Sequence, residues 1–202
     1  AMTSNIAECG GFLKTRPDLP LPDIQLHFCM AVVNNHGRTP FFGNGFSCHV
    51  CLLRPKSRGS VWLKSGDPMQ PPAIDPNFLG DSDDLEAMVG GYKTTGPLPA
   101  ARAGKAPQPA DIFTANVRTD DDIRDVLRRR VDTVYHPVGT CRMGTNDPLA
   151  VVDPRLRVHG LEGLRIADAS IMPTIIGGNT NAPTIMIGEK AADMIKADAK
   201  AA

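Results

Sequence analysis

The sequence predicts an α+β fold, in which a mostly antiparallel sheet carries helices on one face. Its first third contains segments in which apolar and polar residues alternate, as they do in half-buried strands. Later segments repeat apolar residues at helical spacing and begin with residues that cap helices. No G-x-G-x-x-G loop follows a predicted strand, since "GNGFSC" keeps only the first two glycines. The chain by itself therefore lacks the phosphate loop of a dinucleotide-binding fold.

The composition is that of a globular protein rather than of a nucleic-acid or membrane protein. The 202 residues are 42% hydrophobic and 22% charged, and 22 basic residues balance 22 acidic ones. No run of about 20 apolar residues is present, and the N-terminus lacks the basic-then-apolar pattern of a secretory signal. Five cysteines, an odd number, favour reduced thiols. We expect a cytoplasmic protein with no nucleic-acid partner and no transmembrane segment.

The first strands are predicted between residues 23 and 65. In "DIQLHFCMAVV" one face carries the apolar residues Ile24, Leu26, Phe28, Met30 and Val32. "SCHVCLLRP" and "SVWLKS" predict two more strands, and "PKSRG" predicts the hairpin turn that joins them. Cys48 and Cys51 form a C-x-x-C pair, but residues three apart on a strand face opposite sides. We therefore interpret this pair as structural rather than as a zinc or redox site.

Two helices are predicted in the middle of the chain. "SDDLEAMVGGYK" begins with Ser82 as its cap, and its apolar repeat is Leu85, Met88, Val89 and Tyr92. Residues 96–111, rich in proline, alanine and glycine, predict a loop or a short helix within a loop. "TDDDIRDVLRRRVDTV" begins with Thr119 as its cap and an acidic first turn, which the helix dipole favours. The buried stripe of this second helix is Ile123, Val126, Leu127 and Val131, and its three consecutive arginines face solvent.

The last third predicts two short strands and a long helix. "AVVDPRLRVHG" and "LEGLRIADAS" each contain a short apolar run between turn residues, which suits a strand. A helix is predicted to start near Asn181, with Pro183 in its first turn. Its expected buried face consists of Ile187, Ala191, Met194 and Ile195.

One histidine stands out from the five in the chain by its surroundings. His136, in "VYHPVGTCRMG", directly precedes Pro137, which favours extended backbone at the histidine, and Gly139 and Gly144 permit tight turns. No pair of histidines has metal-ligand spacing, so no metal site is predicted. An apolar setting favours a neutral imidazole, which a general base needs. From residue types alone, a structural and a catalytic role for His136 both stay open, with the structural role favoured.

A second candidate segment, "GGNTNAP", precedes the last predicted helix. Asn179 and Asn181 lie where the free backbone N–H groups of a helix start would face an anion. Their amide side chains can donate or accept hydrogen bonds. Taken alone, an ordinary asparagine cap explains this segment equally well or better.

Taken together, these motifs resemble one family. "HPVGTCRMG" and "VVDPRLRVHGLEGLRIADASIMPTIIGGNTNAPTIMIGEKAADMI" closely resemble the C-terminal part of the glucose–methanol–choline (GMC) oxidoreductases, which are flavin-dependent alcohol oxidases and dehydrogenases. The resemblance is nearly continuous from Tyr135 to Ile195. "SNIAECGGFLKTRPDLPLPDIQLHF" and "CLLRPKSRGSVWL" are similar to strands of the substrate domain of that family.

The resemblance implies a division into domains. Residues 1–158 would form the substrate-binding domain with the catalytic histidine segment, and residues 159–202 would add a strand and a helix to the FAD-binding domain. The N-terminal ADP-binding half of the family has no counterpart in the chain. We therefore expect the C-terminal portion of a longer enzyme, inactive without its missing partner half. Three outcomes stay open for the exposed flavin-domain tail, namely disorder, rearrangement, or self-association with another copy.

The resemblance also implies catalytic roles. His136 aligns with the histidine that takes the substrate hydroxyl proton while hydride passes from the alcohol carbon to flavin N5. Asn179 aligns with the second catalytic position, where asparagine is typical of the choline-dehydrogenase-like branch and orients the substrate oxygen. Choline, aliphatic and aromatic alcohols and polyethylene glycol are all substrates within the family, and neither the substrate nor the electron acceptor can be read from the chain.

The implied cofactor is FAD, held in the longer enzyme. Asp168 and Ala169 match family positions near the ribityl-pyrophosphate portion, and Thr180 and Asn181 match backbone positions near the isoalloxazine ring. The alternative reading is a stand-alone, non-catalytic binding domain derived from such an enzyme. That reading predicts drift in the catalytic motifs, and both His136 and Asn179 are present.

Overall fold

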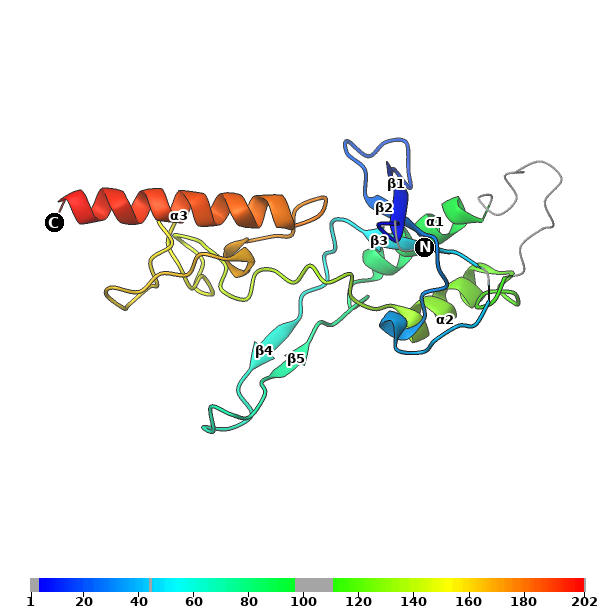
Figure 1. The fold of residues 1–202 in the computed structure, drawn as a ribbon, viewed down its shortest axis with the longest axis horizontal. Helices are drawn as coiled ribbons and strands as arrows, with labels where there is room; N and C mark the ends of the chain where they lie inside the picture. The colour runs from blue at the N-terminus through cyan, green and yellow to red at the C-terminus, as the bar shows by residue number, and fades with distance from the viewer. Residues whose placement is uncertain (1–3, 44, 97–110, 202) are drawn as a thin grey trace. The chain divides into compact units, whose positions relative to one another are not determined.

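The computed structural model describes residues 4–43, 45–96 and 111–201 (Figure 1). Its elements in chain order are β1 (Ala7–Leu13), β2 (Ile24–Cys29), the 3-10 turn η1 (Asn35–Gly37), β3 (Ser47–Leu52), β4 (Ser60–Trp62), β5 (Ala73–Asp75), α1 (Ser82–Thr95), α2 (Asp120–Arg130), the 3-10 turn η2 (Ala169–Ile171) and α3 (Asn181–Ala201). Helices and antiparallel strands confirm the α+β class. Most of the predicted loop over residues 96–111 lies outside the described residues.

Contacts within the chain define two compact units. The first unit combines Ala1–Arg58 with Asn77–Asp132, and the second combines Gly59–Pro76 with Thr133–Ala202. Each unit has its own hydrophobic core. The division predicted at residue 158 concerns the substrate and flavin domains of a longer enzyme, and it stays a prediction.

The first unit contains a three-stranded antiparallel sheet in the order β1-β2-β3. The central strand β2 pairs with both of its neighbours. Its Ile24 lies opposite Leu13 of β1, and its His27 lies opposite His49 of β3. The predicted strand at residues 23–33 is therefore confirmed, but it ends at Cys29. Met30, predicted to continue its apolar face, is 64% exposed, because the chain leaves the sheet before this residue.

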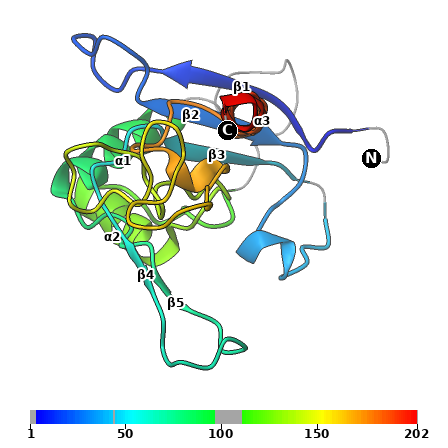
Figure 2. The same ribbon diagram turned by 90° about the vertical axis from the view of Figure 1, so that its left-hand side faces the viewer.

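Helices α1 and α2 cover one face of this sheet, as predicted (Figure 2). The core between them consists of Ile24, Leu26, Leu85, Met88, Val89, Ile123 and Leu127. Each leucine or isoleucine fully buried there contributes about 1.5–3 kcal/mol. Helix α1 approaches the sheet closely at Gly91, where an added Cβ would lie 2.8 Å from Val50 Cγ1. Alternating strand residues and helical apolar stripes thus meet in one core.

The predicted N-cap is confirmed for α2 but not for α1. Helix α2 has the predicted Thr119 cap, and Asp122 completes a capping box by accepting a hydrogen bond from the Thr119 N–H at 2.8 Å. The predicted Ser82 cap of α1 is wrong by one residue. Asp81 has the extended backbone of a cap residue and accepts from the Asp83 N–H at 2.8 Å. Both Asp81 and Ser82 are good caps, so residue type could not decide between them.

The predicted hairpin between the third and fourth strands is wrong. Strand β3 pairs only with β2 among the named strands, and β4 pairs with β5. The intervening "PKSRG" does not turn back, because the buried carboxylate of Asp84 in α1 accepts hydrogen bonds from the backbone N–H groups of Lys56 and Ser57, each at 2.8 Å. The Ser57 hydroxyl donates to the same carboxylate. These bonds hold the segment against the first turn of α1.

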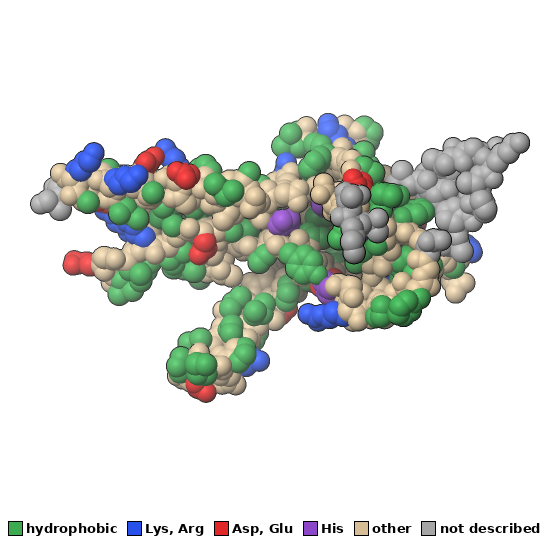
Figure 3. All heavy atoms as spheres, in the orientation of Figure 1, with side chains coloured by type: hydrophobic (Ala, Val, Ile, Leu, Met, Phe, Trp, Pro, Cys, Tyr) green, Lys and Arg blue, Asp and Glu red, His purple; other side chains and the backbone are tan. Residues whose placement is uncertain are grey.

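The second unit contains the two-stranded β4–β5 hairpin, in which Val61 pairs with Ile74. Its side chains include several large apolar groups that are exposed, as the green spheres along the hairpin show (Figure 3). These are Val61, Trp62, Leu63, Met69 and Ile74. A lone two-stranded hairpin is marginally stable in water.

The rest of the second unit packs loops against α3 (Figure 1). Its core consists of Val152, Leu156, Ile171, Met172, Ile187 and Ala191. The two short strands predicted in this region are present only as isolated bridges, such as Val152 with Val158 and Arg157 with Arg165. Left-handed backbone at Leu156 (φ 65°) and Gly160 (φ 76°) turns the chain too often for a continuous strand.

Helix α3 begins at Asn181 with Pro183 in its first turn, as predicted. Ile187 and Ala191 are buried and Met194 packs against the same core, but Ile195 is 50% exposed. Ile195 lies roughly 80° around the helix from Ile187, outside the stripe that faces the loops. Within the described residues, each helix is too short or too polar to cross a membrane.

Candidate functional site

The segment around His136 is held in place by backbone turns and by hydrogen bonds to η2. Gly139 has a left-handed φ of 85°, and a Cβ there would lie 3.3 Å from the Met172 carbonyl oxygen. The Cys141 N–H donates to the Ser170 carbonyl at 3.0 Å, and the Met143 N–H donates to the Ile171 carbonyl at 2.8 Å. The histidine itself is half-buried. The glycine-rich sequence therefore builds a fixed support for the imidazole.

Both ring nitrogens of His136 have a partner from the segment before α3. The Asn179 side-chain nitrogen Nδ2 lies 3.1 Å from Nε2, and the Thr180 hydroxyl oxygen Oγ1 lies 2.8 Å from Nδ1. These partners are 43 and 44 residues away along the chain. The structure thus brings together the two residues to which the family resemblance assigned catalysis. It adds Thr180, whose side chain had no predicted role.

The start of α3 orders the residues that contact His136. The Thr180 carbonyl accepts hydrogen bonds from the Thr184 N–H at 3.0 Å and from the Thr184 hydroxyl at 2.6 Å. Thr180 is only 8% exposed, whereas Asn179 and Asn181 are exposed. The positive end of the α3 dipole therefore lies beside an exposed pair of asparagines.

Asp168 and Ala169, predicted to contact a cofactor, flank the segment that supports His136. Asp168 is exposed and caps η2 by accepting a hydrogen bond from the Ser170 N–H at 2.7 Å. Ala169 is half-buried and packs against the second core. The Cys141–Ser170 hydrogen bond connects η2 to the histidine segment. Among the described residues, the hydrogen-bond partners of the His136 ring are Asn179 and Thr180 rather than Asp168 or Asn181.

The C-x-x-C pair lies on β3, in the first unit. Cys48 packs against the first core, and strand alternation turns Cys51 to the opposite face. Burial raises the pKa of both thiols, which favours their protonated form at neutral pH. No cluster of three or more histidine, cysteine or acidic side chains able to hold a metal ion occurs in the described part of the chain.

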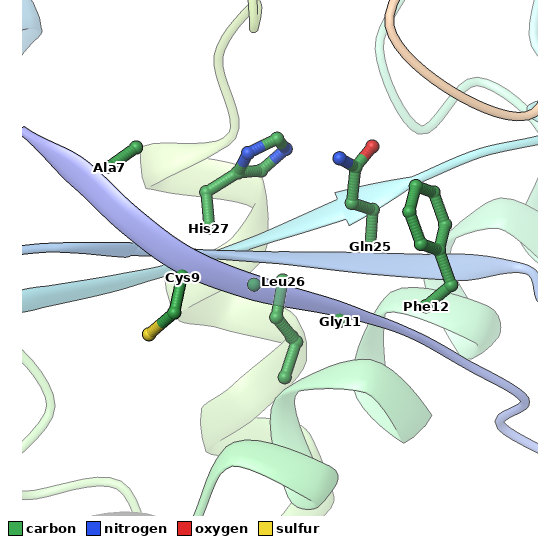
Figure 4. Close-up of a pocket in the computed structure, with 8 residues that line it drawn as sticks. Ala7, Cys9, Gly11, Phe12, Gln25, Leu26 and His27 are labelled. Carbon is green, nitrogen blue, oxygen red and sulfur yellow. The ribbon is translucent and has the colours of Figure 1, made fainter. Parts of the chain in front are cut away.

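A separate cavity of about 350 Å³ lies on β1 and β2 in the first unit. Phe12, Gln25 and His27 project from the sheet face opposite the helices, and Cys9 and Leu26 project from the other face (Figure 4). The residues that line it are Ala7, Cys9, Gly10, Gly11, Phe12, Gln25, Leu26 and His27. Burial, followed by the charge of His27, lowers the pKa of the neighbouring His49. None of the predicted site residues lines this cavity.

Comparison with known proteins identifies a family for this arrangement. The family model described as GMC oxidoreductase matches residues 55–188, which is more than half of the chain. An alcohol dehydrogenase (acceptor) of Pseudomonas putida is 48% identical over 96% of this chain and 35% of its own length. Human mitochondrial choline dehydrogenase is 44% identical over 94% of this chain and 32% of its own length.

Solved structures agree with the sequence relatives. A formate oxidase of Aspergillus oryzae, studied for modification of its FAD, superposes with a TM-score of 0.79. It is 34% identical, and the match covers 90% of this chain and 33% of that one. The chain therefore spans about a third of the length of the relatives it matches. With its histidine and asparagine motifs adjacent in space and with the family model matched over most of its length, the chain belongs to the GMC oxidoreductase family.

Proposed function

We propose that this chain is the substrate and catalytic part of an FAD-dependent oxidoreductase that oxidises alcohols, including choline-like ones. The observation that carries the proposal is the contact of Asn179 Nδ2 with His136 Nε2 at 3.1 Å. This contact places a nitrogen base and an amide donor side by side at the surface. Oxidation of an alcohol uses both, since the base takes the hydroxyl proton and the amide binds the hydroxyl oxygen. The names of the relatives, alcohol dehydrogenase and choline dehydrogenase, support this substrate class.

His136 acts as the general base at Nε2. An alcohol proton is hard to remove at neutral pH, so a base within hydrogen-bond distance contributes about 10²–10⁴-fold to the rate. The hydroxyl inserts between Nε2 and Asn179, and its proton passes to Nε2. The Asn179 amide, now released from the ring, donates to the alcohol oxygen and stabilises its developing negative charge. A neutral amide orients the oxygen without competing for the proton.

The exposed residues beside this pair fit a flavin nucleotide. Asp168, Asn179 and Asn181 are exposed, and they offer a carboxylate, two amides and the first turn of a long helix. A carboxylate suits sugar hydroxyl groups, and a helix N-terminus suits an electron-rich polar ring edge. When bound, FAD would supply the acceptor for the hydride of the alcohol carbon. Asp168 and Ala169 would hold its ribityl-pyrophosphate portion, and Thr180 and Asn181 its ring.

The proposal includes a partner for this chain. Relatives are about three times as long, and the resemblance assigns their ADP-binding half to residues outside this chain. We propose that the chain by itself is inactive and that its large exposed apolar side chains, such as Trp62 and Leu63, are covered in the longer protein or by self-association. The five free cysteines agree with a reducing, cytoplasmic location.

The test compares variants of the longer enzyme that contains this chain. His136→Ala should lower turnover of alcohols and choline by ~100-fold or more, because the base is removed. The control is His159→Ala, which removes an exposed histidine of the same unit that contacts the Gly144 carbonyl at 3.0 Å. Turnover close to wild type in His136→Ala would refute the base assignment.

The same experiment has an arm for the chain alone. The purified 202-residue chain is expected to show no visible flavin absorbance and no alcohol turnover. A yellow chain that oxidises alcohols would show that the cofactor site is complete without further sequence. That outcome would reject inactivity of the chain while leaving the role of His136 intact.

A further inference from the structure

We propose that Thr180 is a positioning residue, which sets the tautomer and the ring orientation of His136 from the side opposite the substrate. This inference rests on the proposed role of His136 as the base. It gives a role to the Thr180 side chain, whereas the family resemblance implied only a backbone position near the isoalloxazine ring. The carrying observation is the 2.8 Å contact between Thr180 Oγ1 and His136 Nδ1.

The two contacts of the ring together determine where its proton lies. A neutral imidazole has one N–H donor and one nitrogen that accepts. The Asn179 amide nitrogen can only donate, and it faces Nε2 at 3.1 Å, so Nε2 is the acceptor. The proton is then on Nδ1 and is donated to Thr180 Oγ1. Nε2, the nitrogen that receives the alcohol proton in the proposed reaction, is thereby kept unprotonated.

Thr180 is better suited than Asn179 to maintain this state. Its side chain belongs to a residue that is 8% exposed, so water competes little for the Nδ1 hydrogen bond. Its backbone is tied to the first turn of α3 by two hydrogen bonds from Thr184 to the Thr180 carbonyl. Asn179 is exposed and has to leave Nε2 when the alcohol binds. During that exchange, the Thr180 contact is the one that remains.

Without the Thr180 hydroxyl, the ring would lose the hydrogen bond that holds the His136 proton on Nδ1. A valine has the shape of threonine but cannot accept the Nδ1 proton. The neutral ring would then be free to carry its proton on Nε2, where it cannot act as a base. A serine keeps the hydroxyl and should keep the tautomer. Thr180→Val and Thr180→Ser therefore separate the hydrogen bond from packing.

The first measurement is nitrogen NMR of the chain with ¹⁵N-labelled histidine, at a pH where imidazoles are neutral. Protonated and unprotonated ring nitrogens differ widely in shift, so the spectrum reports the tautomer directly. His136 is expected to show an unprotonated Nε2 and a protonated Nδ1. Thr180→Val should shift it toward the other tautomer, and Thr180→Ser should restore it. The matched control is Thr174→Val, which is the same change at an exposed threonine of the same unit.

The second measurement is steady-state kinetics of the longer enzyme. Thr180→Val should lower kcat about 10-fold or more with a smaller change in KM, because misorientation of a base affects the chemical step. Thr180→Ser should recover most of kcat. A protonated Nε2 in the wild-type protein, or an unchanged tautomer in Thr180→Val, would overturn the inference, as would an unchanged kcat.

These outcomes are distinguishable from failure of the proposed function. If His136→Ala keeps full turnover, the base assignment fails whatever the NMR spectrum shows, and the positioning role in catalysis falls with it. If His136→Ala is inactive but Thr180→Val behaves like wild type in both measurements, only the role of Thr180 is rejected.

Discussion

Tyr135, directly before His136, has a left-handed backbone with φ 64°. This conformation costs an L-residue roughly 1–2 kcal/mol, and bulky side chains rarely adopt it. The Tyr135 N–H donates to the Thr133 hydroxyl at 2.9 Å, which helps to hold the turn. Strained backbone of this kind is common at functional sites, where contacts with the surrounding structure hold the residue in an unfavourable conformation. Its position beside the proposed base agrees with a site that is organised before substrate arrives.

Glycines in two helices provide a sharp test at the scale of single residues. At Gly91 an added Cβ would meet Val50 Cγ1 at 2.8 Å and Ile24 Cδ1 at 2.9 Å, whereas at Gly188 it would meet nothing within 4 Å. Alanine in a helix gains about 0.5–1 kcal/mol over glycine, and overpacking a core costs about 1–3 kcal/mol. Gly188→Ala should therefore raise the free energy of unfolding, and Gly91→Ala should lower it by about 1 kcal/mol.

Urea denaturation of both variants of the chain measures these changes. Each substitution is the control for the other, because the chemical change is identical and only the surroundings differ. Stabilisation by Gly91→Ala would mean that α1 does not pack against the sheet as closely as described.

At the scale of elements, α3 is tied to its loops by a cluster of charges as well as by its apolar stripe. Asp198, near the end of α3, accepts hydrogen bonds from Arg155 and Arg157, each at 2.6 Å, and from Arg165. The hydrogen bond from Arg157, followed by that from Arg155, lowers the pKa of Asp198 to about 2. Three guanidinium groups around one carboxylate hold the turn at residues 155–165 against the helix.

This cluster predicts an acid-sensitive helix end. A carboxylate whose pKa is lower in the folded than in the unfolded chain stabilises the fold above its unfolded pKa. That stabilisation is lost as the pH falls from about 4 to about 2, where Asp198 gains a proton. Asp198→Asn should be less stable at neutral pH and should show a weaker pH dependence across this window.

Hydrogen exchange of the amides in the last turns of α3, measured against pH, checks this prediction. The wild-type chain should lose protection there on acidification, and the difference from Asp198→Asn should vanish near pH 2. Added salt should weaken the effect, since the arginines are partly exposed. An equal pH dependence in the two proteins would show that the cluster contributes nothing to the helix end.

At the scale of the whole molecule, the two hydrophobic cores share no residue. Leu85, 7% exposed, belongs to the core of the first unit. Leu85→Ala should cost about 2–5 kcal/mol, because it leaves a cavity that the surroundings fill only in part. We expect this loss to raise hydrogen exchange in β2, β3, α1 and α2, with little change in the second unit.

Mass spectrometry of exchanged peptides measures this separation. Ile187→Ala, in the core of the second unit, is the matched control and should affect α3 and its loops instead. Faster exchange of both units in both variants would mean that the chain unfolds as one cooperative body.

Local patterns predicted part of this architecture. The Thr119 cap, the apolar repeat of α1 and Pro183 in the first turn of α3 depend on residues a few positions apart, and all three are present. The partner of β4 depends instead on a contact between distant segments. The buried carboxylate of Asp84, which binds the backbone after β3, prevents the hairpin that turn chemistry alone predicted.

The sequence by itself determined the family, the α+β class and the residues proposed for chemistry, His136 and Asn179. It could do so because motifs, helix caps and apolar periodicities are patterns of residues that lie close together in the sequence. Only the tertiary structure decided which strands pair, which cap begins α1, and that Thr180 supports the ring at Nδ1. Strand pairing and the contact of Thr180 with His136, 44 positions away, depend on the folded path of the chain. The cap of α1 depends on which residue takes the extended backbone that a cap needs, and that residue is Asp81.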